Sequence, residues 1–391
     1  MPQENKKKER VKKMIKFGKW VVKFRIPILI LSFLLLIPTG IIYMNTRINY
    51  DILSYLPGDI ETMKGQDILL DEFGTGAFSV AVIDGMQEKE ISQLEEIDHV
   101  KDVLWYGALA DISIPMDMLP DDLKDSLQNA DTGSQLMIIT FDTSMSADET
   151  LDAIEEIRGL TNEQCLLSGM SAVVTDIKKI CNSEVIMYVV IAAGLSALVL
   201  ALTMDSFLLP FIFLLSIGMA IVYNLGTNFI AGEISFVTQA LAAVLQLAVT
   251  MDYSIFLLNS YEENKKRFEG DKERAMAHAI NATFKSVIGS SITTVAGFIA
   301  LCFMTFSLGR DMGIVMAKGV VIGVLCCVTL LPALVLTFAG AIEKTTHKPL
   351  LPSFDKASAF ITKHYKVWLI IFLVMLFPAI HGNNNLKNYY N

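Results

Sequence analysis

The sequence predicts a polytopic α-helical membrane protein of about seven spans, with an extracytoplasmic α+β domain between spans one and two. Its 391 residues are 53% apolar and include long charge-free runs, a composition typical of membrane proteins. The net charge of −9 is unevenly spread. Residues 1–25 hold 10 basic and 2 acidic side chains, whereas residues 45–184 hold 28 acidic and 8 basic ones. Because basic segments stay on the cytoplasmic side, we expect the N-terminus inside and residues 45–184 outside.

The basic segment, residues 1–25, precedes an apolar run that predicts the first span, residues 26–44. Pro27 lies at the start of this run, where a helix tolerates proline. A cytoplasmic anchor is the simpler interpretation of the basic segment, and specific lipid recognition is the alternative.

Residues 45–184 predict two β-α-β units, because β-branched runs alternate with segments of 3.6-residue periodicity. We expect strands at residues 78–83, 100–106, 136–141 and 164–167, and helices at residues 88–97 and 147–160. Two such units in tandem suit a ferredoxin-like split βαβ fold. Residues 111–134, which hold two prolines and an acidic run, connect them.

Residues 185–340 predict a bundle of five spans. The expected spans are residues 185–203, 207–224, 234–258, 287–306 and 312–338. Residues 259–285 are charged and predict an amphipathic helix on the cytoplasmic face. Residues 341–366 form a basic cytoplasmic linker. Residues 367–391 begin with a seventh span.

Several classes of function lack their motifs. The five cysteines have no metal-ligand spacing, and we expect neither a metal nor another cofactor. There is no Gly-x-x-x-x-Gly-Lys-Ser/Thr loop, no Ser/His/Asp set and only one aspartate within a span. We therefore do not expect an enzyme or an ATP-driven pump, and we expect no nucleic-acid partner.

Asp252 is the only carboxylate in the apolar run of residues 234–258. The next charge, Glu262, is ten residues on, which is about 15 Å along a helix and half of a hydrocarbon core of about 30 Å. A carboxylate at the midplane costs a few kcal/mol, so it predicts a functional site, with Tyr253 as a possible hydrogen-bond donor. The alternative is a structural carboxylate bonded to neighbouring helices.

Polar residues elsewhere are candidates to support Asp252. Gln239, Gln246 and Tyr253 recur every seven residues, so we expect them on one face toward the other helices. Simple interhelical hydrogen bonding and a proton or water path are both open for this face. On the fifth span, the hydroxyls of Ser291, Thr293 and Thr294 lie at a similar depth. They are candidates to hold the carboxylate or a water, although such hydroxyls often bond back to their own helix.

The end of the chain repeats its beginning. With a shift of 340 residues, Leu36-Ile37-Pro38 falls on Leu376-Phe377-Pro378, and Asn45 and Tyr50 fall on Asn385 and Tyr390. The matching proline, and the matching polar residues that follow the span, favour a duplicated span over chance similarity of composition. We expect one half of a duplicated transporter followed by the first span of its second half.

The expected order is one span, a large extracytoplasmic domain, five spans and the start of a repeat. This order resembles that of the resistance-nodulation-division superfamily. Residues 250–254, Thr-Met-Asp-Tyr-Ser, resemble the Asp-Tyr motif of the MMPL-type (mycobacterial membrane protein large) lipid and drug exporters, and residues 289–298 resemble the Ser/Thr-rich fifth span of that group. The resemblance implies a porter-like outer domain, a proton relay at Asp252 and Tyr253, and proton-driven export of hydrophobic or amphiphilic molecules. It implies membrane lipids and such a substrate as partners.

In that family, two such motifs form the relay, and the second lies in the other half. A second half-transporter or a homo-oligomer is therefore an expected partner. The five spans also resemble a sterol-sensing module, and secretion accessory subunits have the same architecture as separate half-length chains. The alternative function is thus an accessory protein that assists secretion or lipid sensing without transporting by itself.

Overall fold

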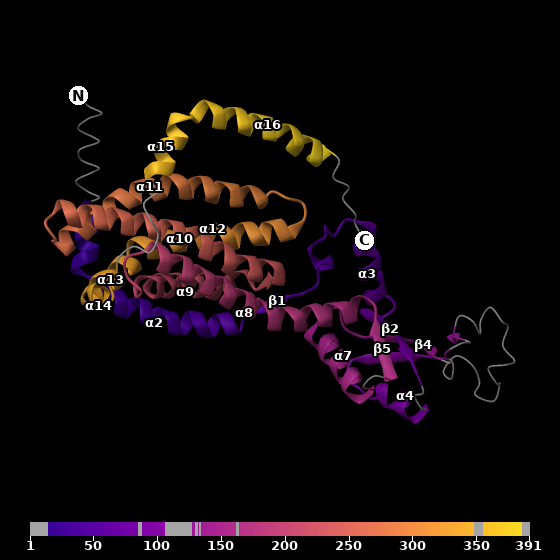
Figure 1. The fold of residues 1–391 in the computed structure, drawn as a ribbon. Coiled ribbons are helices and arrows are strands. Elements are labelled where there is room, and N and C mark those ends of the chain that lie inside the picture. The colour runs from indigo at the N-terminus through magenta and orange to yellow at the C-terminus, as the bar shows by residue number, and fades with distance from the viewer. Residues whose placement is uncertain are drawn as a thin grey trace, which may run out of the picture.

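The computed structural model describes residues 15–84, 88–105, 127–129, 132, 134–161, 164–347 and 355–384. Within them, seven helical segments are long and apolar enough to cross a membrane. They are Arg25–Met44, Met170–Thr203, Leu209–Phe229, Phe236–Arg267, Lys272–Leu301, Ser307–Thr337 and Tyr365–Asn383. The chain is therefore a multi-pass membrane protein, with a bundle of helices joined to a smaller β-sheet region (Figure 1).

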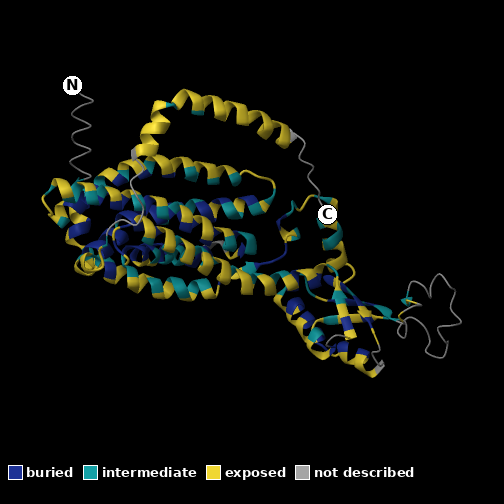
Figure 2. Ribbon diagram, viewed as in Figure 1, coloured by how far each residue is buried: buried dark blue, intermediate teal, exposed yellow. Residues whose placement is uncertain are grey.

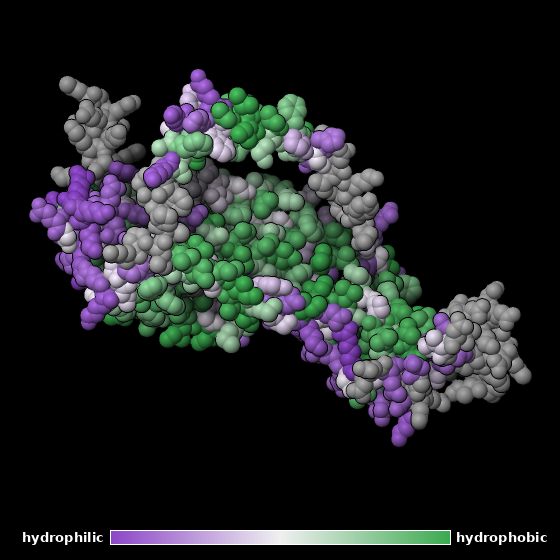
Figure 3. Space-filling model, in the orientation of Figure 1, coloured by the Kyte–Doolittle hydropathy of each residue, from purple (hydrophilic) through white to green (hydrophobic). Residues whose placement is uncertain are grey.

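The bundle is built from helices whose apolar residues run all round, as expected where helices meet lipid or one another. It comprises α2 (Arg25–Met44), α8 (Met170–Thr203), α9 (Leu209–Gly226), α10 (Phe236–Arg267), α11 (Lys272–Leu301), α12 (Ser307–Val328) and α13 (Leu330–Thr337). Helices α9, α10, α12 and α13 are the most buried, and α11 packs along α10 and α12. An apolar surface covers the visible side of the bundle, and polar side chains gather at the end away from the sheet (Figure 3).

The expected amphipathic helix over residues 259–285 is wrong. Helix α10 runs on to Arg267, and α11 already begins at Lys272. Between them, Glu269 and Gly270 have φ of 55° and 90°, left-handed values that end a helix. Asp271 then caps α11, because its side chain accepts a hydrogen bond from the Arg274 amide at 3.0 Å. The charged segment is thus a helical hairpin rather than a separate helix.

Helix α8 begins 15 residues earlier than the expected span at residue 185. Its first turns belong to the sheet region, where they pack against α7 (Asp148–Thr161). Arg158 of α7 holds Asp176 of α8 through two bonds of 2.6 and 3.1 Å. One helix therefore joins the sheet region to the membrane without a break.

The sheet has four antiparallel strands in the order β3-β4-β2-β5. They are β2 (Ala77–Ile83), β3 (Val100–Leu104), β4 (Gln135–Phe141) and β5 (Cys165–Ser168), with α4 (Glu88–Leu94) and α7 completing a β-α-β-β-α-β sequence. All six elements lie within two residues of the expected boundaries except at the end of α4, which stops three residues early. Burial alternates along β2, so one face packs on the helices. Most of the expected connecting segment, residues 111–134, lies outside the described residues.

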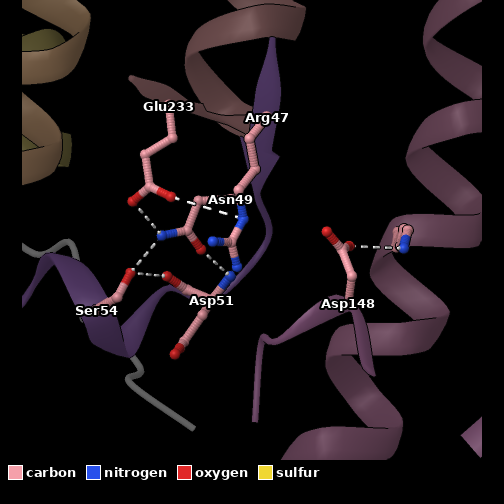
Figure 4. Close-up of polar contacts among 7 residues, drawn as sticks. Arg47, Asn49, Asp51, Ser54, Asp148 and Glu233 are labelled. Atoms are coloured by element: carbon pink, nitrogen blue, oxygen red, sulfur yellow. Dashed lines mark hydrogen bonds and ion pairs between the residues drawn. The ribbon is translucent and has the colours of Figure 1, made fainter. Parts of the chain in front are cut away.

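A second link ties this region to the bundle. Strand β1 (Arg47–Asn49), which follows α2, pairs in parallel with β6 (Glu233–Ser235), which precedes α10. The Asn49 amide donates to Glu233 at 3.0 Å and to Ser54 at 2.9 Å (Figure 4). A short helix η1 (Leu53–Tyr55) and helix α3 (Glu61–Asp71) follow, and η4 (Thr227–Ala231) joins α9 to β6.

The remaining helices are α14 (Ala339–Lys344), α15 (Asp355–Lys363) and α16 (Tyr365–Asn384). Helices α2 and α16 have 20 residues each, and the 340-residue shift carries the bounds of one onto the other. Each contains its proline at the same place, Pro38 and Pro378. Their surroundings differ, because α2 packs against α9 and α13 whereas α16 is not buried at all (Figure 2).

Candidate functional site

Asp252 lies halfway along α10, sixteen residues after its first residue and fifteen before its last. The helix is anchored at the start by Ser235, whose hydroxyl accepts a hydrogen bond from the Val237 amide at 3.2 Å. The Asp252 side chain is exposed on the outward side of the bundle. It makes no hydrogen bond or ion pair with any residue that the structure describes. The carboxylate therefore stands at mid-membrane depth on a free surface of this chain.

The neighbouring Tyr253 points the other way and is 4% exposed, packed in the main core of the bundle. Gln246 is also buried, and it accepts a hydrogen bond from the Asn224 amide of α9 at 3.0 Å. Gln239 donates to the Tyr43 hydroxyl at the end of α2, again at 3.0 Å. The expected shared, inward face of Gln239, Gln246 and Tyr253 is confirmed, and its two glutamines make interhelical hydrogen bonds.

This inward face fits closely against glycines of α12. A Cβ atom on Gly319 would lie 2.6 Å from Asn224 Nδ2 and 3.2 Å from Gln246 Oε1. A Cβ atom on Gly323, one turn later, would lie 2.5 Å from the Thr250 hydroxyl. The polar face of α10 therefore needs the absence of side chains at these two positions, a common way for membrane helices to approach each other.

The hydroxyl groups of α11 bond to their own helix. Thr293 and Thr294 both donate to the Ser290 carbonyl, at 2.7 and 3.1 Å, and Ser291 donates to the Val287 carbonyl at 2.7 Å. Thr293 is exposed, whereas Ser291 is buried. Of the expected support residues, Thr293 is thus exposed, as Asp252 is, and Gln246 and Ser291 are buried.

Asp311 of α12 links that helix to the start of α10. Its carboxylate accepts hydrogen bonds from the Ser235 amide at 2.9 Å and from the Thr238 hydroxyl at 2.5 Å. Both donors belong to the start of α10, so Asp311 of α12 fixes that helix end. Lys318, on the same helix, donates to Asn228 of η4. The partners of Asp311 and Lys318 lie on other elements, so nothing in the sequence near either residue pointed to them.

Two groups beside this helix end titrate abnormally. Burial raises the pKa of the Tyr55 hydroxyl well above its usual value, and the Asp311 carboxylate raises it further. Burial also raises the pKa of the Asp51 carboxyl, although hydrogen bonds from the backbone amides of Leu53 and Ser54 oppose the shift. Tyr55 therefore remains protonated and able to donate at any physiological pH.

The described residues contain no group of three or more His, Cys, Asp or Glu side chains placed to hold a metal ion.

Several known proteins are similar to this chain in sequence. The protein SCO5905 of Streptomyces coelicolor is 27% identical over 241 residues, which are 59% of this chain and 28% of that protein. The siderophore exporter MmpL5 of Mycobacterium tuberculosis is 28% identical over 173 residues, covering 42% of this chain and 18% of the exporter. The chain thus spans less than a third of the length of either relative.

Among solved structures, the crystal structure of SecDF in its super-membrane-facing form matches with a TM-score of 0.44 and 14% identity. The match covers 83% of this chain and 39% of that one. The model of the MMPL family matches residues 61–364, from α3 to the end of α15. The chain belongs to the MMPL family of membrane transport proteins.

Proposed function

We propose that this chain is a half-unit of a proton-driven exporter of hydrophobic or amphiphilic molecules, such as lipids or drugs. Membership of the MMPL family and the likeness to a siderophore exporter support a transport role. The observation that carries the proton-driven part is Asp252, an exposed carboxylate halfway along a membrane-spanning helix. An ionisable group at that depth is expensive to keep without a function.

The carboxylate of Asp252 is the group that takes and releases the proton. In general, apolar surroundings favour the neutral form of a carboxylate, and water or a hydrogen-bond donor favours its charged form. A proton moving through the membrane potential supplies about 2.3 kcal/mol per 100 mV. That energy biases two conformations that differ by a few kcal/mol. Tyr253, which points into the core, supports the relay through the packing of α10, and Thr293 offers an exposed hydroxyl on α11.

The other expected support residues act indirectly. Gln246 is held by Asn224 inside the bundle, and Ser291 and Thr294 bond to the backbone of α11. We assign them the positioning of α10 and α11 rather than contact with the proton. Their effect on transport therefore runs through the packing of the two helices.

The outward surface also supports a partner bundle. Helix α11, which packs along α10, exposes Gly289, Ser290 and Thr293, small residues that let another helix approach closely. Helix α16 repeats α2 and remains unpacked. We infer that a second bundle, either a second half of the transporter or another copy of this chain, covers Asp252 and completes the relay.

The domain assignment follows the same reasoning. The strand order β3-β4-β2-β5 with two crossing helices supports a ferredoxin-like, porter-like domain within residues 45–184. The acidic excess of those residues, and the basic side chains at the opposite end of the bundle, support a cytoplasmic N-terminus and an extracytoplasmic domain.

The test uses the chain reconstituted into liposomes that contain the pH-sensitive dye pyranine. An imposed proton gradient should give proton flux with the native chain, and Asp252→Asn should reduce the flux to the level of empty liposomes. Asp205→Asn is the matched control, because Asp205 is an exposed aspartate in the turn between α8 and α9. Flux retained in Asp252→Asn would overturn the relay. No flux with the native chain, alone or beside its second half, would instead favour the accessory role.

A further inference from the structure

A cavity of about 590 Å³ lies at the end of the bundle that faces the sheet region. It is enclosed by η1, η4, β6 and the first three turns of α12. Its charged and polar lining consists chiefly of Tyr55, Asn228, Glu233, Arg310, Asp311 and Lys318. The Ser307 hydroxyl donates to the Tyr55 carbonyl at 2.9 Å and holds η1 against α12. The cavity therefore has walls fixed by hydrogen bonds between separate elements.

The two acidic residues of the lining are already satisfied. Asp311 accepts from the Ser235 amide and the Thr238 hydroxyl. Glu233 accepts from the Asn49 amide at 3.0 Å and lies 3.9 Å from the Arg47 guanidinium. Both carboxylates therefore already have hydrogen-bond partners outside the cavity lining.

Among the described residues, two buried donors of the lining have no acceptor, and its two cations have no carboxylate partner. The amide nitrogen of Asn228, a residue only 2% exposed, has no hydrogen-bond partner, nor does the hydroxyl of Tyr55, which is 9% exposed. Lys318 donates to the neutral Asn228 side chain, and in the described part of the chain neither Lys318 nor Arg310 has a carboxylate within ion-pair distance. A buried donor without an acceptor is destabilising. Two buried donors without an acceptor, on Asn228 and Tyr55, and two cations without an ion pair to a described residue, Lys318 and Arg310, therefore line the same cavity.

The depth of the cavity adds a second constraint. Lys318 follows Arg310 by eight residues, which is about 12 Å along α12. Ile314 lies one turn from each of them, lines the cavity and is 48% exposed. Along α12 the cavity is thus lined first by the Arg310 guanidinium, then by the apolar side chain of Ile314, and last by the Lys318 ammonium group. A ligand that fits it carries a negative group and tolerates apolar surroundings.

We propose that this cavity binds the anionic group, phosphate or carboxylate, of an amphiphilic molecule, with Lys318, Asn228 and Tyr55 as donors and Arg310 at the mouth. Phosphate and carboxylate oxygens accept several hydrogen bonds from such donors at once. The acyl chain lies against Ile314 and leaves along the surface of the bundle. Use of the site for exported cargo rests on the proposed function, whereas binding of the anion does not.

The test measures binding to the full chain in the neutral detergent dodecyl maltoside by microscale thermophoresis. The probes are oleoyl lysophosphatidic acid, monoolein, which has the same acyl chain without the phosphate, and inorganic phosphate. We expect the lysophosphatidic acid to bind at least about tenfold more tightly than monoolein, because monoolein leaves the donors unpaired. Equal binding of inorganic phosphate would support the anion site and assign it to a free anion. Equal binding of monoolein would overturn the proposal.

Variants locate the site. Lys318→Met should weaken lysophosphatidic acid binding at least about tenfold and leave monoolein unchanged. Arg310→Gln, at an exposed position, should weaken it about threefold. Lys285→Met removes an exposed cation of α11 far from the cavity and should bind as the native chain does. Native-like binding by both cavity variants would overturn the assignment. Asp252→Asn should keep this binding, so a failure of the proton relay and a failure of the anion site give different results.

Discussion

The two sides of α10 carry polar residues of opposite character. Inward, Gln246 and Thr250 are buried against α9 and α12, and glycines of α12 make room for them. Outward, Asp252 is exposed at the same depth and no described residue bonds to it. The inward residues pack closely against other helices, whereas no described residue holds the outward one. Polar residues two positions apart in one membrane helix therefore have opposite surroundings, and the proposed function gives only the outward one a chemical role.

The largest loss of stability is expected when a side chain fills the space that the inward side of α10 requires. Gly319→Val places a Cβ atom 2.6 Å from Asn224 Nδ2, so it should lower the free energy of unfolding by about 3 kcal/mol or more through overpacking and the lost amide bond. Reversible unfolding in mixed micelles of dodecyl maltoside and sodium dodecyl sulfate measures this change.

The control for this variant is Gly297→Val on α11, where an added Cβ atom would meet nothing within 4 Å. Gly297→Val should change the free energy of unfolding by less than about 1 kcal/mol. A similar loss in both variants would show that glycine contributes through helix flexibility rather than through the contact with Asn224.

A smaller effect is expected from removing one amide of the inward side. Gln246→Leu leaves the Asn224 amide without its acceptor in a buried place, so the free energy of unfolding should fall by about 1–3 kcal/mol. The double variant Asn224→Leu, Gln246→Leu should be less destabilised than the sum of the single variants, because no polar group then stays unpaired. Additive losses in the same unfolding measurement would contradict a direct pair.

The smallest effect on stability is expected on the outward side. Asp252→Asn and Thr293→Val should each change the free energy of unfolding by no more than about 0.5 kcal/mol, because both side chains are exposed and Thr293 bonds only to its own helix. Asp252→Asn should nevertheless lose proton flux. A loss above about 1.5 kcal/mol for Asp252→Asn would mean that its carboxylate is a structural group.

The sequence predicted much of this arrangement for identifiable reasons. Hydropathy placed the spans, and the heptad recurrence of Gln239, Gln246 and Tyr253 correctly placed them on an inward face. Partners from other elements, such as Asn224 for Gln246, left no local signal, because hydrogen bonds between helices have no fixed spacing in sequence. Such pairs become visible only once the packing of the helices is known.

Two predicted helix boundaries, at the start of α8 and between α10 and α11, were wrong for physical reasons. The charged first half of α8 concealed that one helix continues from the sheet region into the membrane. The hairpin between α10 and α11 had a readable signal, since Gly270 followed by Asp271 is the usual pair of a helix end and the next helix cap. The charge pattern of residues 259–285 favoured a single amphipathic helix and outweighed that signal.

The continuous helix α8 has a geometric consequence. Its 34 residues contain no proline and make a rod about 51 Å long. Each degree by which the membrane half tilts displaces the far end by about 0.9 Å. Arg158 and Asp176 clamp that end to α7, so the sheet region must follow it. A rotation of a few degrees within the bilayer is therefore magnified into a shift of several ångströms of the sheet region, without bending the helix that joins it to the bundle.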